Sequence, residues 1–409
     1  MKQITLKHPN ALLHGQLSIT GSKSESNRLL VLQALYPELQ INNLSNSDDT
    51  QAMQNGLYSD ESIIDIGHAG TTMRFLTAFF ATQDGVEKVL TGSKRMQERP
   101  ISVLVDALRQ LGADISYEKN EGYPPLRIKG KKLSKHEVTL AAHVSSQYIS
   151  ALLLVAPKLP NGLHLKLEGK ITSVPYIEMT CALLRQIGVS VAFEGQDIRV
   201  EPKDAPKSKE LWVESDWSSA SYFFGLTALA DKAKLKLSTY KANSLQGDRV
   251  LVDIYKHLGV ISMLKENHLF LEKSNVSIET LNVDLANAPD IAQTIAVSCF
   301  GMGVGCYLTG LHTLKIKETD RLLALETELS KLGAEIEVTQ DSLSLKPRKV
   351  AIIPHVAIDT YHDHRMAMAF APLGICVPIV INDADVVSKS YPSFWDDLRS
   401  LGFFIDSDK

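Results

Sequence analysis

The chain has 409 residues, 44% hydrophobic and 22% charged, and its 43 Lys and Arg against 47 Asp and Glu give a formal net charge of −4. This composition is typical of a globular protein of two to three domains, and it excludes a disordered chain and argues against a broadly basic nucleic-acid-binding protein. Four cysteines without a CxxC pair argue against a disulfide framework and a structural zinc site, and they favour the reducing cytoplasm.

The sequence favours neither a secreted protein nor a membrane protein. The first ten residues lack the apolar run of a signal peptide, so we expect no secretory leader. The longest apolar stretch, residues 366–381, is broken by Pro372, Gly374 and Pro378, whereas a membrane span needs roughly 18 or more unbroken apolar residues.

One series of predicted helices begins at small polar residues that precede strongly apolar runs. Ser, Thr and Asp are favoured there because their oxygens accept hydrogen bonds from the first N–H groups of a helix. The runs lack a polar face, so we expect these helices to be buried on nearly all sides. They are residues 22–32, 69–80, 144–154, 215–226, 288–297 and 362–371.

A second series of predicted helices ends at a glycine and is followed by residues that favour strands. Glycine enters a positive φ at little cost, which is the usual way for a helix to end. The glycines recur 69 to 76 residues apart, at Gly112, Gly188, Gly259, Gly333 and Gly402.

The two series together predict six repeats, each with strands and two helices. The first repeat is shorter, because only 47 residues separate Ser24 from Thr71. Three repeats in each half give two globular domains. The charged segment 195–214 contains Pro202 and Pro206 and suits a crossover, so we place a domain boundary near Glu214.

Cations gather at the predicted starts of these helices although the chain as a whole is acidic. Helix N-termini carry a partial positive charge and free N–H groups, and Arg grips carboxylates and phosphates with two hydrogen bonds. The pattern predicts a site for small, highly anionic ligands. The cations are Lys23, Arg28, Arg74, Arg95, Lys317, Arg321, Arg365 and Lys389.

A dozen segments in register over nearly the whole chain resemble the 5-enolpyruvylshikimate-3-phosphate synthase family. They are GSKSESNR, AGTTMR, RMQERPI, YPPLRI, SSQYISALL, SVPYIEMT, SDWSSASYF, NSLQGD, PDIAQTIA, IKETDRL, YHDHRMAMAF and SKSYP. The resemblance implies an α/β fold of two domains, each an inside-out α/β barrel of three βαβαββ repeats. It places residues 1–20 and 215–409 in domain I and 21–214 in domain II, with the active site in the cleft between them.

The resemblance also implies a transferase of the shikimate pathway of aromatic amino-acid biosynthesis. Such an enzyme moves the enolpyruvyl group of phosphoenolpyruvate to the 5-hydroxyl of shikimate 3-phosphate and releases phosphate. The implied contacts to shikimate 3-phosphate come from Lys23, Ser24, Arg28, Ser145, Ser146, Gln147, Ser173, Asp290, Thr313 and Lys317. The implied contacts to phosphoenolpyruvate come from Lys23, Gly70, Arg95, Gln147, Arg321, Arg365 and Lys389.

Three residues carry the implied chemistry. Asp290 is the base that takes the 5-hydroxyl proton, Lys317 assists proton transfer, and Glu318 delivers a proton to the methylene carbon. By its position alone Asp290 is equally an N-cap residue. Lys317 and Glu318 are neighbours at a predicted helix start, where side chains point roughly 100° apart and serve different atoms.

Some positions depart from the family pattern. His68 stands where Asn is common, Phe75 where Pro is common, and Thr313 where Asn is common. The first two border the segment of Gly70, where the family binds its inhibitor glyphosate, so they bear on inhibitor sensitivity. A Thr hydroxyl at position 313 can keep one hydrogen bond.

We expect no metal, because the His362 and His364 pair lacks HExxH-like spacing, and no nicotinamide cofactor, because GxGxxG is absent. We expect a cytoplasmic monomer that acts on small molecules, without nucleic-acid or membrane partners. Two alternatives stay open. One is the sister transferase that uses UDP-N-acetylglucosamine, which typically has a reactive loop Cys. The other is a non-catalytic anion-binding repeat protein.

Overall fold

The structure, a computed structural model, describes residues 2–141, 145–207, 210–276 and 278–407. The chain divides into two compact units: unit 1 is Met1–Thr20 with Glu214–Lys409, and unit 2 is Gly21–Val213. This division falls one residue before the boundary expected from the sequence. Glu214 groups with unit 1 because its buried carboxylate accepts hydrogen bonds there from Trp217 Nε1 at 2.8 Å, Lys241 N at 2.8 Å and Ser244 Oγ at 2.6 Å.

Unit 1 contains three four-stranded sheets. In each, two parallel strands are followed by an antiparallel pair, as a βαβαββ repeat requires. One sheet has the order β14 (Val260–Lys265), β15 (His268–Lys273), β13 (Lys232–Ser238), β2 (Leu12–Leu17). The second has the order β16 (Thr280–Asp284), β17 (Gly305–Thr309), β19 (Leu343–Leu345), β18 (Ile336–Val338). The third has the order β20 (Ala357–Ile358), β21 (Ile379–Ile381), β1 (Ile4–Lys7), β22 (Phe404–Ser407).

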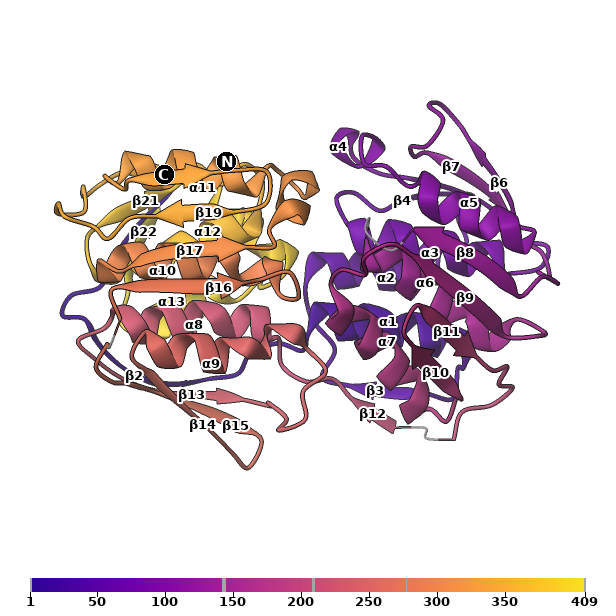
Figure 1. The fold of residues 1–409 in the computed structure, drawn as a ribbon, viewed down its shortest axis with the longest axis horizontal. Coiled ribbons are helices and arrows are strands. Elements are labelled where there is room, and N and C mark those ends of the chain that lie inside the picture. Colours follow the sequence, from indigo (N-terminus) through magenta and orange to yellow (C-terminus); the bar gives the residue numbers. More distant parts are fainter. Residues whose placement is uncertain (1, 142–144, 208–209, 277, 408–409) are drawn as a thin grey trace. The chain divides into compact units, whose positions relative to one another are not determined.

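Three helices of unit 1 pack on one another inside these sheets: α8 (Trp217–Leu229), α10 (Ala292–Met302) and α12 (His364–Phe370). They are buried on almost all sides, as their uniformly apolar runs predict. In Figure 1, α8 and α9 lie beside β13, β14 and β15 at the lower margin of this unit. The other helices of unit 1 are α9 (Leu251–His257), α11 (Arg321–Lys331) and α13 (Phe394–Ser400), with 3₁₀ turns η2 (Gly247–Val250), η3 (Pro289–Ile291), η4 (His312–Ile316), η5 (Ala371–Ile375) and η6 (Ala384–Lys389).

Unit 2 repeats this plan with two four-stranded sheets and one two-stranded sheet among its described residues. The first has the order β4 (Ile63–Asp65), β5 (Glu87–Thr91), β7 (Leu126–Lys129), β6 (Asp114–Tyr117), and the second β10 (Val191–Glu194), β11 (Asp197–Val200), β9 (Leu163–Glu168), β8 (Glu137–Ala141). The third pairs β3 (Gln40–Asn42) in parallel with β12 (Glu210–Trp212). In Figure 1, α3 and α5 lie against the β7 and β6 side of this unit. Its helices are α1 (Lys23–Leu35), α2 (Asp48–Leu57), α3 (Gly70–Ala81), α4 (Lys94–Gln97), α5 (Ser102–Leu111), α6 (Ser146–Val155) and α7 (Val174–Gln186), with 3₁₀ turn η1 (Ala156–Lys158).

The predicted repeats are confirmed, with one correction. Five of the six have the full βαβαββ set of strands, but the short first repeat has only β3 and its partner β12 in the described chain. The absence of a hairpin agrees with the length of the first repeat, because 47 residues accommodate two helices and a strand but no further hairpin.

The predicted helix ends are confirmed at the glycines, and side-chain N-caps form at four of the six predicted starts, since α3 and α10 have none. Each of the five recurring glycines has a positive φ, from 74° at Gly259 to 106° at Gly112. Ser22, Ser145, Asp216 and Asp363 accept N-terminal hydrogen bonds with their side chains. Within the described ranges, no helix has both the length and the apolar character to cross a bilayer.

Candidate active site

The N-terminal ends of the three buried helices of unit 1 are joined by Arg365, at the second residue of α12. Its Nη2 donates to Asp290 Oδ2 at 3.2 Å and to Ser218 Oγ of α8 at 3.3 Å, and its Nη1 donates to the Asp290 carbonyl at 3.1 Å. Asp290 lies in η3, directly before α10. Three helix N-termini therefore meet around one carboxylate, which makes this end of the unit electropositive.

Arg321 is the centre of the ion-pair network. It is 2% exposed at the first position of α11 and donates to three carboxylates. Nε donates to Asp363 Oδ2 at 2.6 Å, Nη1 to Asp290 Oδ1 at 2.9 Å and Nη2 to Glu318 Oε2 at 2.9 Å. The planar guanidinium thus uses three of its nitrogens for three separate segments of the chain.

Lys317 and Glu318 have different partners, as their adjacency predicts. Lys317 Nζ lies 3.5 Å from Asp290 Oδ1, and Lys389 Nζ donates to Glu318 Oε1 at 3.1 Å. The prediction that the two residues begin a helix is wrong: Lys317 is the C-cap residue after η4, and α11 begins three residues after Glu318, with Asp320 as its N-cap. The turn between η4 and α11 directs Lys317 to a carboxylate and Glu318 to cations.

Asp290 is not an N-cap residue, since α10 has no side-chain cap and the carboxylate is engaged by cations. Burial on its own would raise the pKa of Asp290. The positive charges of Arg365, Lys317 and Arg321 outweigh burial and hold this pKa below its usual range. Burial and the neighbouring arginines lower the pKa of Lys317, against the opposing pull of Asp290 and Glu318.

A further carboxylate, Asp248, lies behind this network. It is 3% exposed, and its Oδ2 accepts a hydrogen bond from Ser218 Oγ, the hydroxyl that also faces Arg365. Burial raises the pKa of Asp248 to about 6, with Asp290 adding to the shift and Arg365 opposing it. Its Oδ1 has no hydrogen-bond partner among the described residues.

In unit 2, Lys23 and Arg28 lie on the first two turns of α1. Lys23 Nζ donates to Asp49 Oδ2 at 3.0 Å and keeps 19% of its side chain exposed. Arg28 is 2% exposed and donates to Thr180 Oγ1 at 2.8 Å and Ser150 Oγ at 3.0 Å. Burial lowers the pKa of Arg28 to about 10, still well above neutrality, so the guanidinium keeps its charge.

Gly70 begins α3 beneath two arginines. A Cβ at this position would lie 2.6 Å from Arg99 Nη1 and 3.0 Å from Arg74 Nη1, so any side chain would displace a guanidinium. Arg74 Nη1 donates to the Gly70 carbonyl at 2.8 Å. Sequence reasoning did not single out Arg99, whose position over this helix N-terminus depends on the turn after α4.

At the start of α6, Ser145 Oγ accepts from Gln147 N at 3.3 Å, and Gln147 Nε2 reaches Thr71 Oγ1 of α3 at 3.3 Å. Ser146 is the first residue of this helix. The expected phosphate site and the segment of Gly70 are thus joined by one hydrogen bond. Ser173 precedes α7 in a left-handed conformation, with φ of 54°.

Other predicted residues lie less centrally. Arg95 is on α4 with 47% of its side chain exposed and pairs with Glu98 at 3.5 Å. Ser24 contributes its carbonyl to Arg28 at 2.7 Å. Thr313 lies in η4, and its buried Oγ1 has no hydrogen-bond partner within the described chain.

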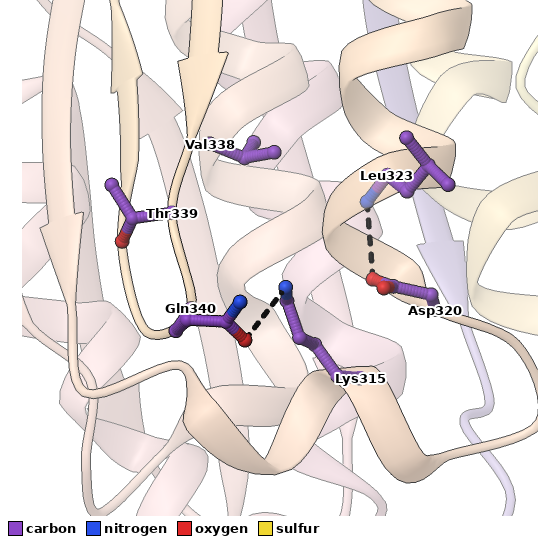
Figure 2. A pocket seen from close by; sticks show the side chains of 6 residues that line it. All are labelled: Lys315, Asp320, Leu323, Val338, Thr339 and Gln340. Carbon is purple, nitrogen blue, oxygen red and sulfur yellow. Dashed lines mark hydrogen bonds between the residues drawn. The ribbon is translucent and has the colours of Figure 1, made fainter.

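A cavity of about 370 Å³ lies beside the start of α11 and is separate from the ion-pair network. Figure 2 shows Lys315 Nζ donating to Gln340 Oε1, at 3.0 Å, and Leu323 N donating to Asp320. The first bond connects the turn between β18 and β19 to η4, which contains Thr313 and directly precedes Lys317. Among the described residues, no group of three or more His, Cys, Asp or Glu is arranged to hold a metal ion.

Beyond Asp290 and Glu318, sequence reasoning missed the carboxylates of this network. Asp363 is fully buried, caps α12 through Arg365 N at 2.9 Å and binds Arg321. Its position at the beginning of the predicted helix 362–371 was an available N-cap signal. Asp248 and Ser218 had no such local signal, because they meet only when α8 packs beside η2.

Comparisons with known proteins identify the family of the chain. A family model described as EPSP synthase (3-phosphoshikimate 1-carboxyvinyltransferase) matches residues 54–398. The chain is 46% identical over 393 residues to a 3-phosphoshikimate 1-carboxyvinyltransferase of Bacteroides fragilis, which covers 95% of both chains. It is 36% identical over 433 residues to the enzyme of that name from Haemophilus influenzae, which covers 98% of this chain and 99% of the relative.

Solved structures show the same fold. Two structures of EPSP synthase from Acinetobacter baumannii match all of this chain and all of their own with TM-scores of 0.82 and 0.80, at 21% identity. The extent of the family match and the identity to full-length relatives lead to one conclusion: the chain belongs to the EPSP synthase family.

Proposed function

We propose that the chain transfers the 1-carboxyvinyl group of phosphoenolpyruvate to the 5-hydroxyl of shikimate 3-phosphate and releases phosphate, as a step of aromatic amino-acid biosynthesis. The observation that carries the proposal is the network of Arg321, Arg365, Lys317 and Lys389 around Asp290 and Glu318. It places cations for an anionic substrate in direct contact with two carboxylates for proton transfer.

Phosphoenolpyruvate meets the cations of this network. Its carboxylate and phosphate carry up to three negative charges, and we assign them to Arg321, Arg365 and Lys389. In unit 2 we assign contacts to Lys23, Gly70, Arg95 and Gln147. Arg321 is restrained by the buried carboxylate of Asp363 and Arg365 by the carboxylate of Asp290, so both guanidinium groups are oriented before the substrate arrives, which reduces the cost of ordering them.

Shikimate 3-phosphate meets hydroxyl and amide donors as well as cations. The exposed part of Lys23 and the start of α6 support this assignment, because a helix N-terminus with serines offers several donors to a phosphate. Asp290, Thr313 and Lys317 contact the sugar-like ring and its 5-hydroxyl. The unit 2 contacts are Lys23, Ser24, Arg28, Ser145, Ser146, Gln147 and Ser173.

The electrostatics support Asp290 as a base that becomes active only when substrate binds. In the structure, three cations hold its pKa low, which makes it a weak base. Phosphoenolpyruvate shares Arg365 and Arg321 with Asp290 and adds negative charge beside it. Both changes raise the pKa of Asp290 and increase its affinity for the 5-hydroxyl proton.

The reaction then proceeds by addition and elimination. The 5-hydroxyl oxygen bonds to C2 of phosphoenolpyruvate as Asp290 takes its proton, and Glu318 gives a proton to the methylene carbon, which becomes a methyl group. In the second step the methyl group returns a proton to Glu318, the C2–O bond to phosphate breaks, and phosphate leaves with the proton that Asp290 took. Lys317 and the arginines stabilise the charge that develops on the oxygens.

We further propose that the enzyme is a monomer of the cytoplasm. The four cysteines support this location, since they are free thiols, three of them buried. Size-exclusion chromatography with light scattering tests the oligomeric state.

The proposal is tested by phosphate release from phosphoenolpyruvate with shikimate 3-phosphate, with UDP-N-acetylglucosamine as the control acceptor. We expect release with the first acceptor only. Asp290→Asn should bind both substrates but turn over at least ~10²-fold more slowly, the lower range for a general base. Release with neither acceptor, or an Asp290→Asn variant with normal turnover, would contradict the proposal or the role of Asp290 respectively.

A further inference from the structure

The turn before α12 has an unusual backbone. Tyr361 and His362 both have left-handed conformations, with φ of 54° and 56°. Such values are uncommon for residues other than glycine, and two in succession persist only where the surroundings hold them. The next three residues are Asp363, His364 and Arg365. The turn therefore decides where the α12 end of the ion-pair network lies.

The turn is held by Glu328 of α11, a carboxylate that is fully buried and has no part in the proposed chemistry. Its Oε1 accepts from the Tyr361 hydroxyl at 2.6 Å, and its Oε2 accepts from Asp359 N at 3.1 Å. Burial and this carboxylate raise the pKa of Tyr361, so the hydroxyl keeps its proton and stays a donor at neutral pH.

Lys331 completes this attachment. Its Nζ donates to Glu328 Oε2 at 2.7 Å and to Asp359 Oδ2 at 2.9 Å. Lys331 therefore contacts both Glu328 on its own helix and Asp359 at the start of the turn, so it joins α11 to the turn. The hydrogen bonds of the Glu328 carboxylate are costly to break, because each lost donor leaves a buried oxygen without a partner.

Helix α11 thus holds the turn at two points. Arg321 binds Asp363 at the N-terminus of the helix, and Glu328 binds Tyr361 seven residues later. Seven residues are nearly two helical turns, so both side chains lie on the same face of α11. The two left-handed residues, Tyr361 and His362, lead directly into the cap of α12, and the His362 ring also meets Asp383 Oδ2 at 2.9 Å.

We propose that Glu328 is a positioning residue for the phosphoenolpyruvate cations. Through Tyr361 and the Asp359 amide it holds the turn so that Asp363 meets Arg321 and Arg365 meets Asp290. This inference rests on the proposed function for its kinetic consequence, but not for its structural one.

The kinetic test compares Tyr361→Phe with Tyr255→Phe. The second variant controls for the loss of a tyrosine hydroxyl: Tyr255 lies in the same unit and its hydroxyl meets Ser298 Oγ at 2.8 Å, away from the turn, although Tyr255 is fully buried and Tyr361 is 37% exposed. We expect Tyr361→Phe to raise KM for phosphoenolpyruvate roughly tenfold, the scale of one lost hydrogen bond to a charged group, with KM for shikimate 3-phosphate within twofold. The control should change neither KM.

Rescue separates positioning from loss of stability. Glu328→Gln keeps an oxygen that accepts from Tyr361, whereas Glu328→Ala does not, so the increase in KM for phosphoenolpyruvate should be smaller for Gln than for Ala. Equal increases for both substrates, or the same effect in Tyr255→Phe, would overturn the proposal.

Amide hydrogen exchange tests the structural part without any activity. In Tyr361→Phe, the amides of Asp363 and Arg365, which donate to Thr360 O and Asp363 Oδ1, should exchange faster than in the wild type. The Ser219 amide, which donates to Asp216 at the start of α8, should not change. Unchanged exchange in all three amides overturns the inference, whereas wild-type enzyme that releases no phosphate contradicts only the proposed function.

Discussion

At the scale of single residues, the network depends on the shape of Arg321 as much as on its charge. Its three donors reach three carboxylates from different segments. Arg321→Lys keeps the charge but loses the fork, so it can satisfy only part of this set. We expect KM for phosphoenolpyruvate to rise by at least ~10-fold while calorimetric affinity for shikimate 3-phosphate changes little.

Arg321→Ala is the less informative change. It leaves the fully buried Asp363 without its main partner, and breaking a buried pair in this way costs about 3–5 kcal/mol. The result for Arg321→Lys that would contradict the assignment is an equal loss of affinity for both substrates.

Asp248 gives a prediction about pH and stability. Its folded pKa of about 6 lies above the value near 3.9 of an unfolded Asp, so the folded chain binds this proton more tightly. The stability that protonated Asp248 contributes is complete below about pH 4 and is lost as pH rises through 6. Burial is the main cause, with Asp290 and Asp216 adding and Arg365 and the Ser218 hydrogen bond opposing.

Asp248→Asn removes this titration and keeps the shape of the side chain. Urea unfolding of both proteins should show similar stability at pH 4.5, and a variant more stable by about 2 kcal/mol at pH 7.5. The difference between the two proteins isolates Asp248 from carboxylates such as Asp290, whose lowered pKa acts in the opposite direction. A difference that does not vary with pH would mean that the Asp248 pKa is not raised.

The cations of the site were predictable from sequence because each lies within a few residues of a helix start. Most of the carboxylates that pair with these cations were not predictable from the sequence. Asp363 gave an N-cap signal, but its bond to Arg321 spans 42 residues, and Ser218 meets Asp248 across 30 residues. Such pairs form through packing between elements, which local patterns do not encode.

At the scale of elements, β1 is the informative case. It lies between β21 and β22, and it alone connects them in the described sheet. Leu6 is fully buried in β1 and pairs with Ile379, whereas Thr5 faces the other side of the strand. We expect Leu6→Ala to cost about 2–5 kcal/mol of unfolding free energy, and Thr5→Ala less than about 1 kcal/mol.

Chemical unfolding with a probe in unit 1, such as Trp395, would measure both changes. Equal costs would mean that β1 contributes its backbone hydrogen bonds but no packing. The helices around this sheet were predicted from N-caps and terminal glycines, but the sheet order was not, because β1 and β22 are nearly 400 residues apart in sequence.

At the scale of the whole molecule, unit 2 is one continuous segment inserted into unit 1. The two ends of the insertion in unit 1 lie close together, since Asp216 N donates to Thr20 O at 3.0 Å. Residues 21–213 should therefore fold alone, and unit 1 should fold when a short Gly-Ser linker joins Thr20 to Glu214. Neither product should release phosphate from phosphoenolpyruvate.

Thermal unfolding followed by circular dichroism measures both fragments. A single cooperative transition in each supports two independent folding units, and a fragment that unfolds without a transition contradicts its independence. The spacing of the polar helix starts and of the five recurring glycines favoured this division, although α3 and α10 lack side-chain N-caps. In the sequence, the missing hairpin of the first repeat was indicated only by the short interval of 47 residues between Ser24 and Thr71.

The central place of β1 also sets an order on biosynthesis. A ribosome releases the N-terminal residues first, yet Ile4–Lys7 need β21 and β22, which emerge almost 400 residues later. Throughout that interval the strand stays without its sheet, and the inserted unit 2 is complete long before. Unit 1, which contains Asp290 and Glu318, can close only after translation is nearly finished, so the nascent chain carries the apolar side chains of Ile4 and Leu6 without their sheet for most of its synthesis.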